Sequence, residues 1–83
     1  MLKLKFFASL REALGCADEQ LALPEGVATL GALRVSLAAR GGEWARLTAN
    51  KSLRCAINHE VAHDGATVAD GDEVAFFPPV TGG

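Results

Sequence analysis

The chain has 83 residues, of which 49% are hydrophobic and 22% are charged, and its formal net charge is −2. This length and composition predict one globular domain with a small core and exclude a disordered chain. The negative charge argues against a nucleic acid or an anionic membrane as partner, and the apolar runs are too short to span a bilayer. No charged-then-apolar signal segment opens the chain, so we expect a cytoplasmic protein.

The N-terminal part of the chain predicts a strand, a short helix and a second strand. Residues 2–8 alternate between a leucine-rich face, expected to be buried, and a lysine-bearing face that also carries Phe7. Ser9 is the expected N-cap of the short helix, and Gly15 can end that helix in the left-handed conformation. Residues 18–23 alternate again and predict the second strand.

The next segment predicts one main amphipathic helix. Thr29 can cap it, and leucines recur along a single face that should be buried, at positions Leu30, Leu33 and Leu37. Gly31 costs this helix about 1 kcal/mol relative to alanine, but it can allow a close approach to the sheet. Trp44 and Leu47 then predict a short turn that packs back on the core.

The second half of the chain predicts three more strands, over residues 53–57, 61–62 and 73–77. Asp70-Gly71 is a strong tight-turn pair before the last of them. The order strand, helix, strand, helix and three strands indicates the α+β class, with one main helix over a mixed sheet and a short helix after the first strand.

Side chains that could bind a metal or perform catalysis form no recognisable constellation. His59 and His63 are four residues apart, but both lie beside turns, where the metal-binding geometry of a helix is lost. Cys16 and Cys55 have no metal-type spacing and are interpreted as buried or incidental thiols. We expect no metal site, and the roles of these four residues stay open.

The last segment of the chain suggests a chemical function. The strand ends at Pro78 and Pro79, which cannot donate ladder hydrogen bonds and hold the backbone extended. A short tail follows, consisting of Val80, Thr81, Gly82 and Gly83. Four extended residues reach roughly 13–14 Å, and the glycines can thread where a side chain would clash. We therefore expect a domain over residues 1–79 and a tail over residues 80–83 that delivers its carboxylate to a second protein.

Both ends of the chain resemble one known family. The segment Asp70-Gly-Asp-Glu-Val-Ala-Phe-Phe-Pro-Pro-Val-Thr-Gly-Gly83 is similar to the C-terminal signature of the small subunits of molybdopterin synthase. Lys5-Phe-Phe-Ala8 and Leu10-Arg-Glu12 also resemble that family. The resemblance implies a ubiquitin-like β-grasp fold, in which the first and last strands lie side by side and parallel.

The resemblance further implies a sulfur-carrier mechanism. A ubiquitin-activating-like enzyme would use ATP to adenylate Gly83, and a persulfide sulfur would then turn the terminus into a thiocarboxylate. The tail, ending in Gly82 and Gly83, would enter the large catalytic subunit of molybdopterin synthase. There the sulfur would attack a cyclic pterin precursor to build the dithiolene of molybdopterin. In this interpretation the chain is a non-catalytic sulfur donor in a heterotetramer and binds no cofactor itself.

The implied strand pairing predicts a docking face. Phe7 and Phe77 would lie together on the outer face of the sheet, with Val61 as a weaker third candidate. We expect the partner to contact this apolar patch and the tail that follows it, through Pro78, Pro79, Val80 and Thr81. The acidic residues Asp70, Asp72 and Glu73 either steer docking to a basic surface or form a solvated turn.

Three alternatives stay open at this point. Another β-grasp sulfur carrier, serving thiazole synthesis or tRNA thiolation, would share the Gly-Gly ending, although the Phe-Phe-Pro-Pro-Val-Thr segment before it favours the molybdopterin family. A ubiquitin-like protein modifier would be joined to lysines by isopeptide bonds. A plain interaction module with an incidental tail would not need Gly83.

Overall fold

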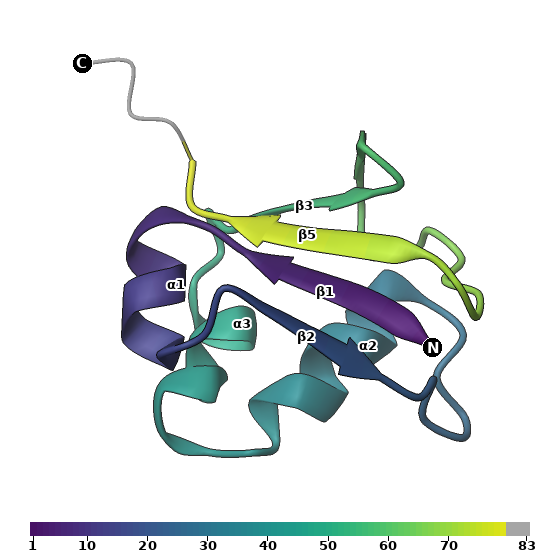
Figure 1. The fold of residues 1–83 in the computed structure, drawn as a ribbon, viewed down its shortest axis with the longest axis horizontal. Helices are drawn as coiled ribbons and strands as arrows, with labels where there is room; N and C mark the ends of the chain where they lie inside the picture. The colour runs from purple at the N-terminus through teal and green to yellow at the C-terminus, as the bar shows by residue number, and fades with distance from the viewer. Residues whose placement is uncertain (80–83) are drawn as a thin grey trace.

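A five-stranded mixed sheet organises the computed structural model, which describes residues 1–79. The strands in chain order are β1 (Leu2–Phe6), β2 (Asp18–Leu21), β3 (Arg54–Ile57), β4 (Glu60–Ala62) and β5 (Glu73–Phe77). They lie in the order β2-β1-β5-β3-β4 (Figure 1). β1 and β5 are parallel, and the other neighbours are antiparallel. The parallel pairing of the first and last strands is therefore confirmed.

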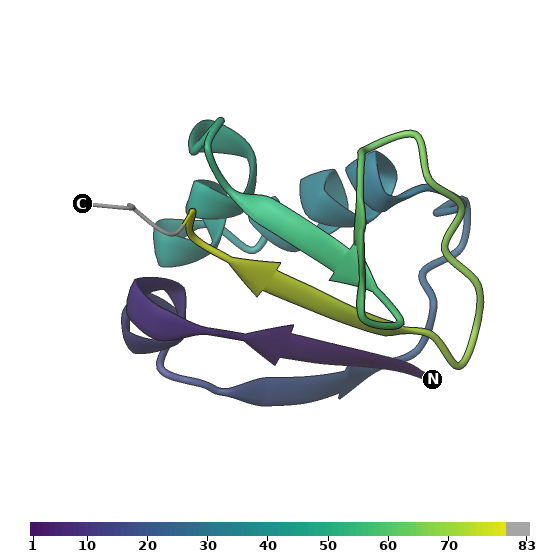
Figure 2. The same cartoon turned by 90° about the horizontal axis from the view of Figure 1, so that it is seen from above.

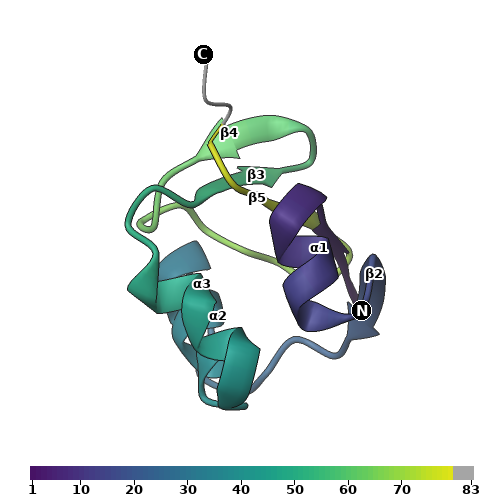
Figure 3. The ribbon, with the colours of Figure 1, turned by 90° about the vertical axis from the view of Figure 1, so that its left-hand side faces the viewer.

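The helices gather on one side of this sheet. They are α1 (Ala8–Leu14), the main helix α2 (Leu30–Ala38), a 3₁₀ turn η1 (Gly42–Ala45) and α3 (Arg46–Ala49). Figures 2 and 3 show α2 and α3 against one face of the sheet, while α1 stands at the end of β1. The segment predicted as a short turn forms η1 and α3, and Leu47 within it is fully buried. Among the helices of residues 1–79, none combines the length and apolar character needed to cross a membrane.

The core lies between the sheet and the helices α2 and α3. Its large side chains come from alternate strand positions, from the predicted stripe of α2 and from α3, and at most 1% of each is exposed: Leu2, Leu4, Phe6, Leu30, Leu33, Leu37, Leu47, Val74 and Phe76. The rings of Phe6 and Phe76 stack with centroids 5.7 Å apart, and Phe6 meets Trp44 edge-on at 5.4 Å. Burying each such side chain contributes about 1.5–3 kcal/mol.

The ends of the two longer helices test the predicted caps. The Oγ1 of Thr29 accepts a hydrogen bond from the Ala32 amide at 3.2 Å, and Gly15 is left-handed with φ 71°, so both predictions are confirmed. The N-cap prediction for Ser9 is wrong, because α1 begins at Ala8 and is preceded by Phe7. The Phe7 amide donates to the Phe76 carbonyl at 3.2 Å. The helix therefore starts directly where the sheet pairing stops.

Gly31 permits a close approach, but to a loop and not to the sheet. A Cβ atom at this position would lie 3.1 Å from the Cβ of Asp64 and 3.2 Å from its carbonyl oxygen. The Gly31 amide donates to that same carbonyl at 2.9 Å. The missing side chain lets the loop after β4 close over the start of α2.

Candidate docking surface

The face of the sheet opposite the helices carries an open, largely apolar hollow of about 470 Å³. Its lining comes from β1, β5, β3 and β4, which are consecutive strands of the sheet, and from the residues that follow β1 and β3: Lys5, Phe7, Ala56, His59, Val61, Glu73, Ala75 and Phe77. Side chains alternate between the two faces of a strand, so the neighbours of these residues on β1 and β5 fill the core. The docking hollow, as we call it below, is thus the reverse side of the core sheet.

Strand register explains why this face is hollowed. Ala75 is paired with Ala56 on β3, and Ala56 is paired with Val61 on β4. The two alanines provide a low floor in the middle of the face. Phe77 lies one step beyond Ala75 on the same face of β5, and Phe7 lies beside it because the Phe6–Phe76 pair aligns β1 with β5. Larger side chains therefore stand around a floor of small ones.

The apolar side chains around the hollow are open to solvent. Phe7 is 47% exposed and Val61 is 69% exposed, while Phe77 is half-buried. Clustered exposed apolar groups on a small domain are typical of an interaction site. The structure thus brings together the three side chains that the sequence analysis placed on this face. Their role in partner binding stays a prediction.

Polar residues also line the hollow. At the end away from the aromatic rings, the Nε2 of His59 lies 3.6 Å from the Oε2 of Glu73. Lys5 of β1 is paired with Ala75 and lies between that end and Phe7. Strand alternation could have placed Lys5, Ala56 and Glu73 here from the sequence. His59 could not be placed in this way because it belongs to a turn.

The acidic residues before β5 have structural partners and do not adjoin the Phe77 end of the strand. Asp70 contacts the Met1 amino group at 2.6 Å, and the hydrogen bond and charge of that ammonium lower the pKa of Asp70. Asp72 accepts from the Ala69 amide at 2.8 Å. Both precede the start of β5, beside the N-terminus (Figure 1). For Asp70 and Asp72 the interpretation as a turn is therefore favoured, whereas Glu73 belongs to β5 and lines the docking hollow.

Of the segment that follows β5, the structure describes only the two prolines. Pro78 and Pro79 follow β5 directly and are half-buried. Val80, Thr81, Gly82 and Gly83 lie outside the described residues. The surface predictions for Phe7, Val61 and Phe77 therefore have a structural setting, whereas those for the tail remain sequence predictions.

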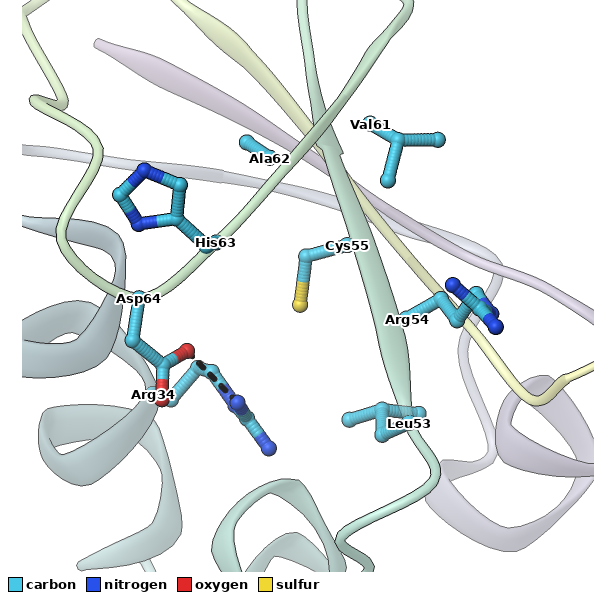
Figure 4. Close-up of a pocket in the computed structure, with 8 residues that line it drawn as sticks. All are labelled: Arg34, Leu53, Arg54, Cys55, Val61, Ala62, His63 and Asp64. Carbon is cyan, nitrogen blue, oxygen red and sulfur yellow. Dashed lines mark hydrogen bonds and ion pairs between the residues drawn. The ribbon is translucent and has the colours of Figure 1, made fainter.

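A second hollow, of about 280 Å³, lies on the other side of β3 and contains the thiol of Cys55 (Figure 4). Arg34 lines it but is held in place, because its Nη1 donates to Asp64 Oδ1 at 2.7 Å and its Nε to the Leu47 carbonyl at 2.8 Å. His63 belongs to this hollow and His59 to the docking hollow. Within residues 1–79 no cluster of three or more His, Cys, Asp or Glu side chains could hold a metal ion.

Burial makes Cys55 unsuited to nucleophilic chemistry. Cys55 is 3% exposed, and desolvation raises the pKa of its thiol to about 11. At pH 8 only about one molecule in a thousand would carry the thiolate, which is the reactive form. Burial, followed by the charge of Glu19, also raises the pKa of Cys16, which is only partly buried.

We expect Cys55 to resist iodoacetamide in the folded protein and to react once the domain unfolds. Cys16 should be modified first, because its thiol is the more accessible. Peptide mass mapping over a time course, with and without denaturant, measures both rates. Modification of Cys55 in the folded state as fast as in the denatured state would contradict the buried, protonated thiol.

Comparisons with known proteins agree with this architecture. A family model described as the ThiS family matches residues 4–83. A relative from Haemophilus influenzae, named molybdopterin synthase sulfur carrier subunit, is 42% identical over 83 residues, which cover 100% of both chains. The crystal structure of SAMP1 from Haloferax volcanii is 30% identical, with a TM-score of 0.77, and the match covers 99% of this chain and 98% of that one.

A further solved structure is a complex between subunits 1 and 2 of molybdopterin-converting factor from Helicobacter pylori. The matching chain is 22% identical with a TM-score of 0.66, and the match covers 99% of this chain and 97% of that one. At this identity the likeness shows the fold alone. The structural matches and the strand order together confirm the ubiquitin-like β-grasp fold.

Proposed function

This chain belongs to the ThiS family, and we propose that it is the sulfur-carrier small subunit of a molybdopterin synthase. The observation that carries the proposal is structural: the docking hollow runs along β5 and is bordered by Phe77, the last residue of that strand, directly before the Pro-Pro-Val-Thr-Gly-Gly sequence. A partner that binds the hollow is therefore within reach of the C-terminus. The full-length relative named as a sulfur carrier supports this function over the alternatives.

The chemistry of the proposed carrier is that of its terminal carboxylate. An ATP-dependent, ubiquitin-activating-like enzyme joins the Gly83 carboxylate to AMP and releases pyrophosphate. The acyl adenylate is a good electrophile because AMP is a good leaving group. A persulfide sulfur attacks the acyl carbon and AMP departs, after which a thiol cleaves the remaining S–S bond. Gly83 is left as a thiocarboxylate, with one oxygen replaced by sulfur.

The large catalytic subunit uses this sulfur in the proposed reaction. The thiocarboxylate sulfur attacks a carbon of a cyclic pterin precursor, and the carbon–oxygen bond at that carbon breaks. Water then hydrolyses the resulting thioester, so that Gly83 returns as a carboxylate and the sulfur stays on the pterin. Two such transfers build the dithiolene of molybdopterin. Acid, base and oxyanion groups belong to the large subunit. This chain contributes the sulfur and its position, because holding a reactant in place removes much of the entropic part of a barrier.

Docking on the hollow supplies the binding energy for this positioning. Truncating an aromatic hot-spot side chain in an interface costs about 2 kcal/mol or more of binding free energy. Phe7 and Phe77 are aromatic side chains at one end of the docking hollow, and Val61 adds apolar area across the alanine floor. Lys5, His59 and Glu73 form a polar border that can fix the orientation of the partner.

Two measurements on the intact protein test the proposed function. Mixed with the large synthase subunit from the same source, the chain should form a stable complex in size-exclusion chromatography with light scattering. After incubation with its activating enzyme, ATP and a persulfide donor, its C-terminal peptide alone should gain the mass of an oxygen-to-sulfur exchange. Omission of ATP is the matched control.

Either measurement can overturn the proposal. A chain that binds no large subunit but acquires sulfur serves another thiolation pathway. A chain that accumulates in isopeptide-linked conjugates, without acquiring sulfur, is a protein modifier.

A further inference from the structure

One asparagine side chain ties the turn between β3 and β4 to the start of β5. The Nδ2 of Asn58 donates to Asp72 Oδ1 at 3.0 Å, and the Glu73 amide donates to the Oδ1 of Asn58 at 3.0 Å. The Asn58 amide also donates to the Glu73 carbonyl at 2.8 Å. Asp72 is fixed in turn by the Ala69 amide, which donates to its second carboxylate oxygen at 2.8 Å.

These contacts require both groups of the Asn58 amide in one orientation. Its nitrogen faces a carboxylate, which can only accept, and its oxygen faces a backbone N–H, which can only donate. Turning the amide over would place like groups against each other at both contacts. The hydrogen bond to the carboxylate is charge-assisted and therefore stronger than a neutral one.

This network holds the turn between β3 and β4. That turn positions β4, which is the part of the docking hollow with the fewest contacts to the rest of the sheet. β4 has three residues and, among the described strands, pairs with β3 alone. Val61 in its centre is 69% exposed, so the core does not fix its place. Asn58 and His59 form the two-residue turn, both with positive φ (50° and 71°). Asparagine tolerates this conformation, so its identity serves the turn as well as the tie.

We propose that Asn58 and Asp72 are a positioning pair, which sets where Val61 stands in the docking hollow before a partner arrives. This inference rests on the proposed function. Phe7 and Phe77 are placed by the β1–β5 pairing, whereas Val61 lies on an edge hairpin that depends on its turn. A surface that is ordered in advance binds more tightly, because no ordering entropy is lost on association.

Exchanging the two side chains tests the pair. In Asn58→Asp the new carboxylate faces that of Asp72, so a hydrogen bond becomes a like-charge contact. In the double variant N58D/D72N, the amide at position 72 donates to the carboxylate at position 58. That carboxylate still accepts from the Glu73 amide, and the oxygen at position 72 still accepts from the Ala69 amide. All three side-chain contacts are thus restored with the roles reversed.

Loss of one charge-assisted hydrogen bond can shift the hairpin about tenfold away from its wild-type position. Because only the fraction of molecules in the binding-competent position binds, we expect N58D to weaken binding to the large synthase subunit about tenfold. The double variant should return to within about twofold of the wild type. In the free protein, the NMR methyl shifts of Val61 should move in N58D and return in the double variant. Isothermal titration calorimetry and methyl spectra measure the two effects separately.

Thr29→Ala is the matched control, because Thr29 caps α2 on the helix side of the sheet. It should lower the melting temperature but leave both affinity and the Val61 shifts unchanged. Asp72→Asn, which introduces no like charges, should weaken binding less than N58D and is the milder variant to use if N58D does not fold.

The positioning role is wrong if the double variant binds no better than N58D, or if the Val61 shifts stay unchanged in N58D and D72N. Absence of binding by the wild type would instead overturn the proposed function. In that case the Val61 shifts of the free variants still decide whether the pair places this residue.

Discussion

Removal of Gly83 is expected to abolish sulfur transfer and to leave the melting temperature of the domain unchanged. The last buried core residue of the described part is Phe76, so the fold does not depend on the terminal glycine. The deletion moves the carboxylate back by about 3.5 Å, one residue of extended chain. A misplacement of even 1 Å can cost about 10²-fold in rate, so a shift of this size should leave no measurable transfer.

Gly83→Ala distinguishes the effect of tail length from the steric effect of a side chain at the last position. It keeps the carboxylate at the same distance along the chain and adds only a Cβ, so it should transfer sulfur more slowly than the wild type but faster than the deletion. Both variants should still bind the large subunit, because they leave the docking hollow untouched. Single-turnover transfer from a preformed thiocarboxylate measures the rates. A deletion that transfers sulfur at the wild-type rate would refute the carrier role of Gly83.

The elements that the sequence predicted best are those whose burial follows a simple period. Alternation in β1 and β5 separated Phe6 from Phe7 and Phe76 from Phe77, and the leucine spacing of α2 identified its buried face. Alternation says nothing about which strands are neighbours. The parallel pairing of β1 with β5, which brings Phe7 beside Phe77, came from the family resemblance.

The features that the sequence did not reveal depend on contacts between distant segments. In the sequence Asp72 is one residue of an acidic run, but its hydrogen-bond partner Asn58 is 14 residues away. The start of α1 was misplaced because Phe7 is needed in the sheet, where its amide bonds the Phe76 carbonyl. Residue preferences near a helix end contain no information about a hydrogen-bond partner on a distant strand. The place of His59 in the docking hollow was missed for a different reason: it belongs to the turn between β3 and β4, whose side chains strand alternation does not place.

Neighbouring phenylalanines on β5 should respond oppositely to the same truncation. Phe76 is fully buried and stacks on Phe6, so Phe76→Ala should lower the free energy of unfolding by about 3–5 kcal/mol. For a domain of this size each 1 kcal/mol corresponds to roughly 4–8 °C in melting temperature. Phe76→Ala should therefore melt roughly 12–40 °C below the wild type.

Phe77→Ala should keep the fold and lose the partner. Phe77 is half-buried on the outer face, where it lines the docking hollow. We expect its truncation to cost less than about 1 kcal/mol in stability. Loss of an aromatic contact worth about 2 kcal/mol would weaken binding to the large subunit by roughly 30-fold. Thermal unfolding and titration calorimetry on the same preparations give both quantities.

A control variant on the helix side of the sheet shows whether partner binding depends on the docking hollow or on exposed apolar area in general. Val35 is 64% exposed on α2, on the helix side of the sheet, so Val35→Ala should change neither stability nor affinity appreciably. Phe7→Ala should weaken binding as Phe77→Ala does, because the two rings flank the same end of the hollow. If a folded Phe77→Ala variant binds with wild-type affinity, the partner does not use this face. Equal loss of affinity in Val35→Ala would show that binding responds to general apolar exposure and not to the surface formed by β1 and β5.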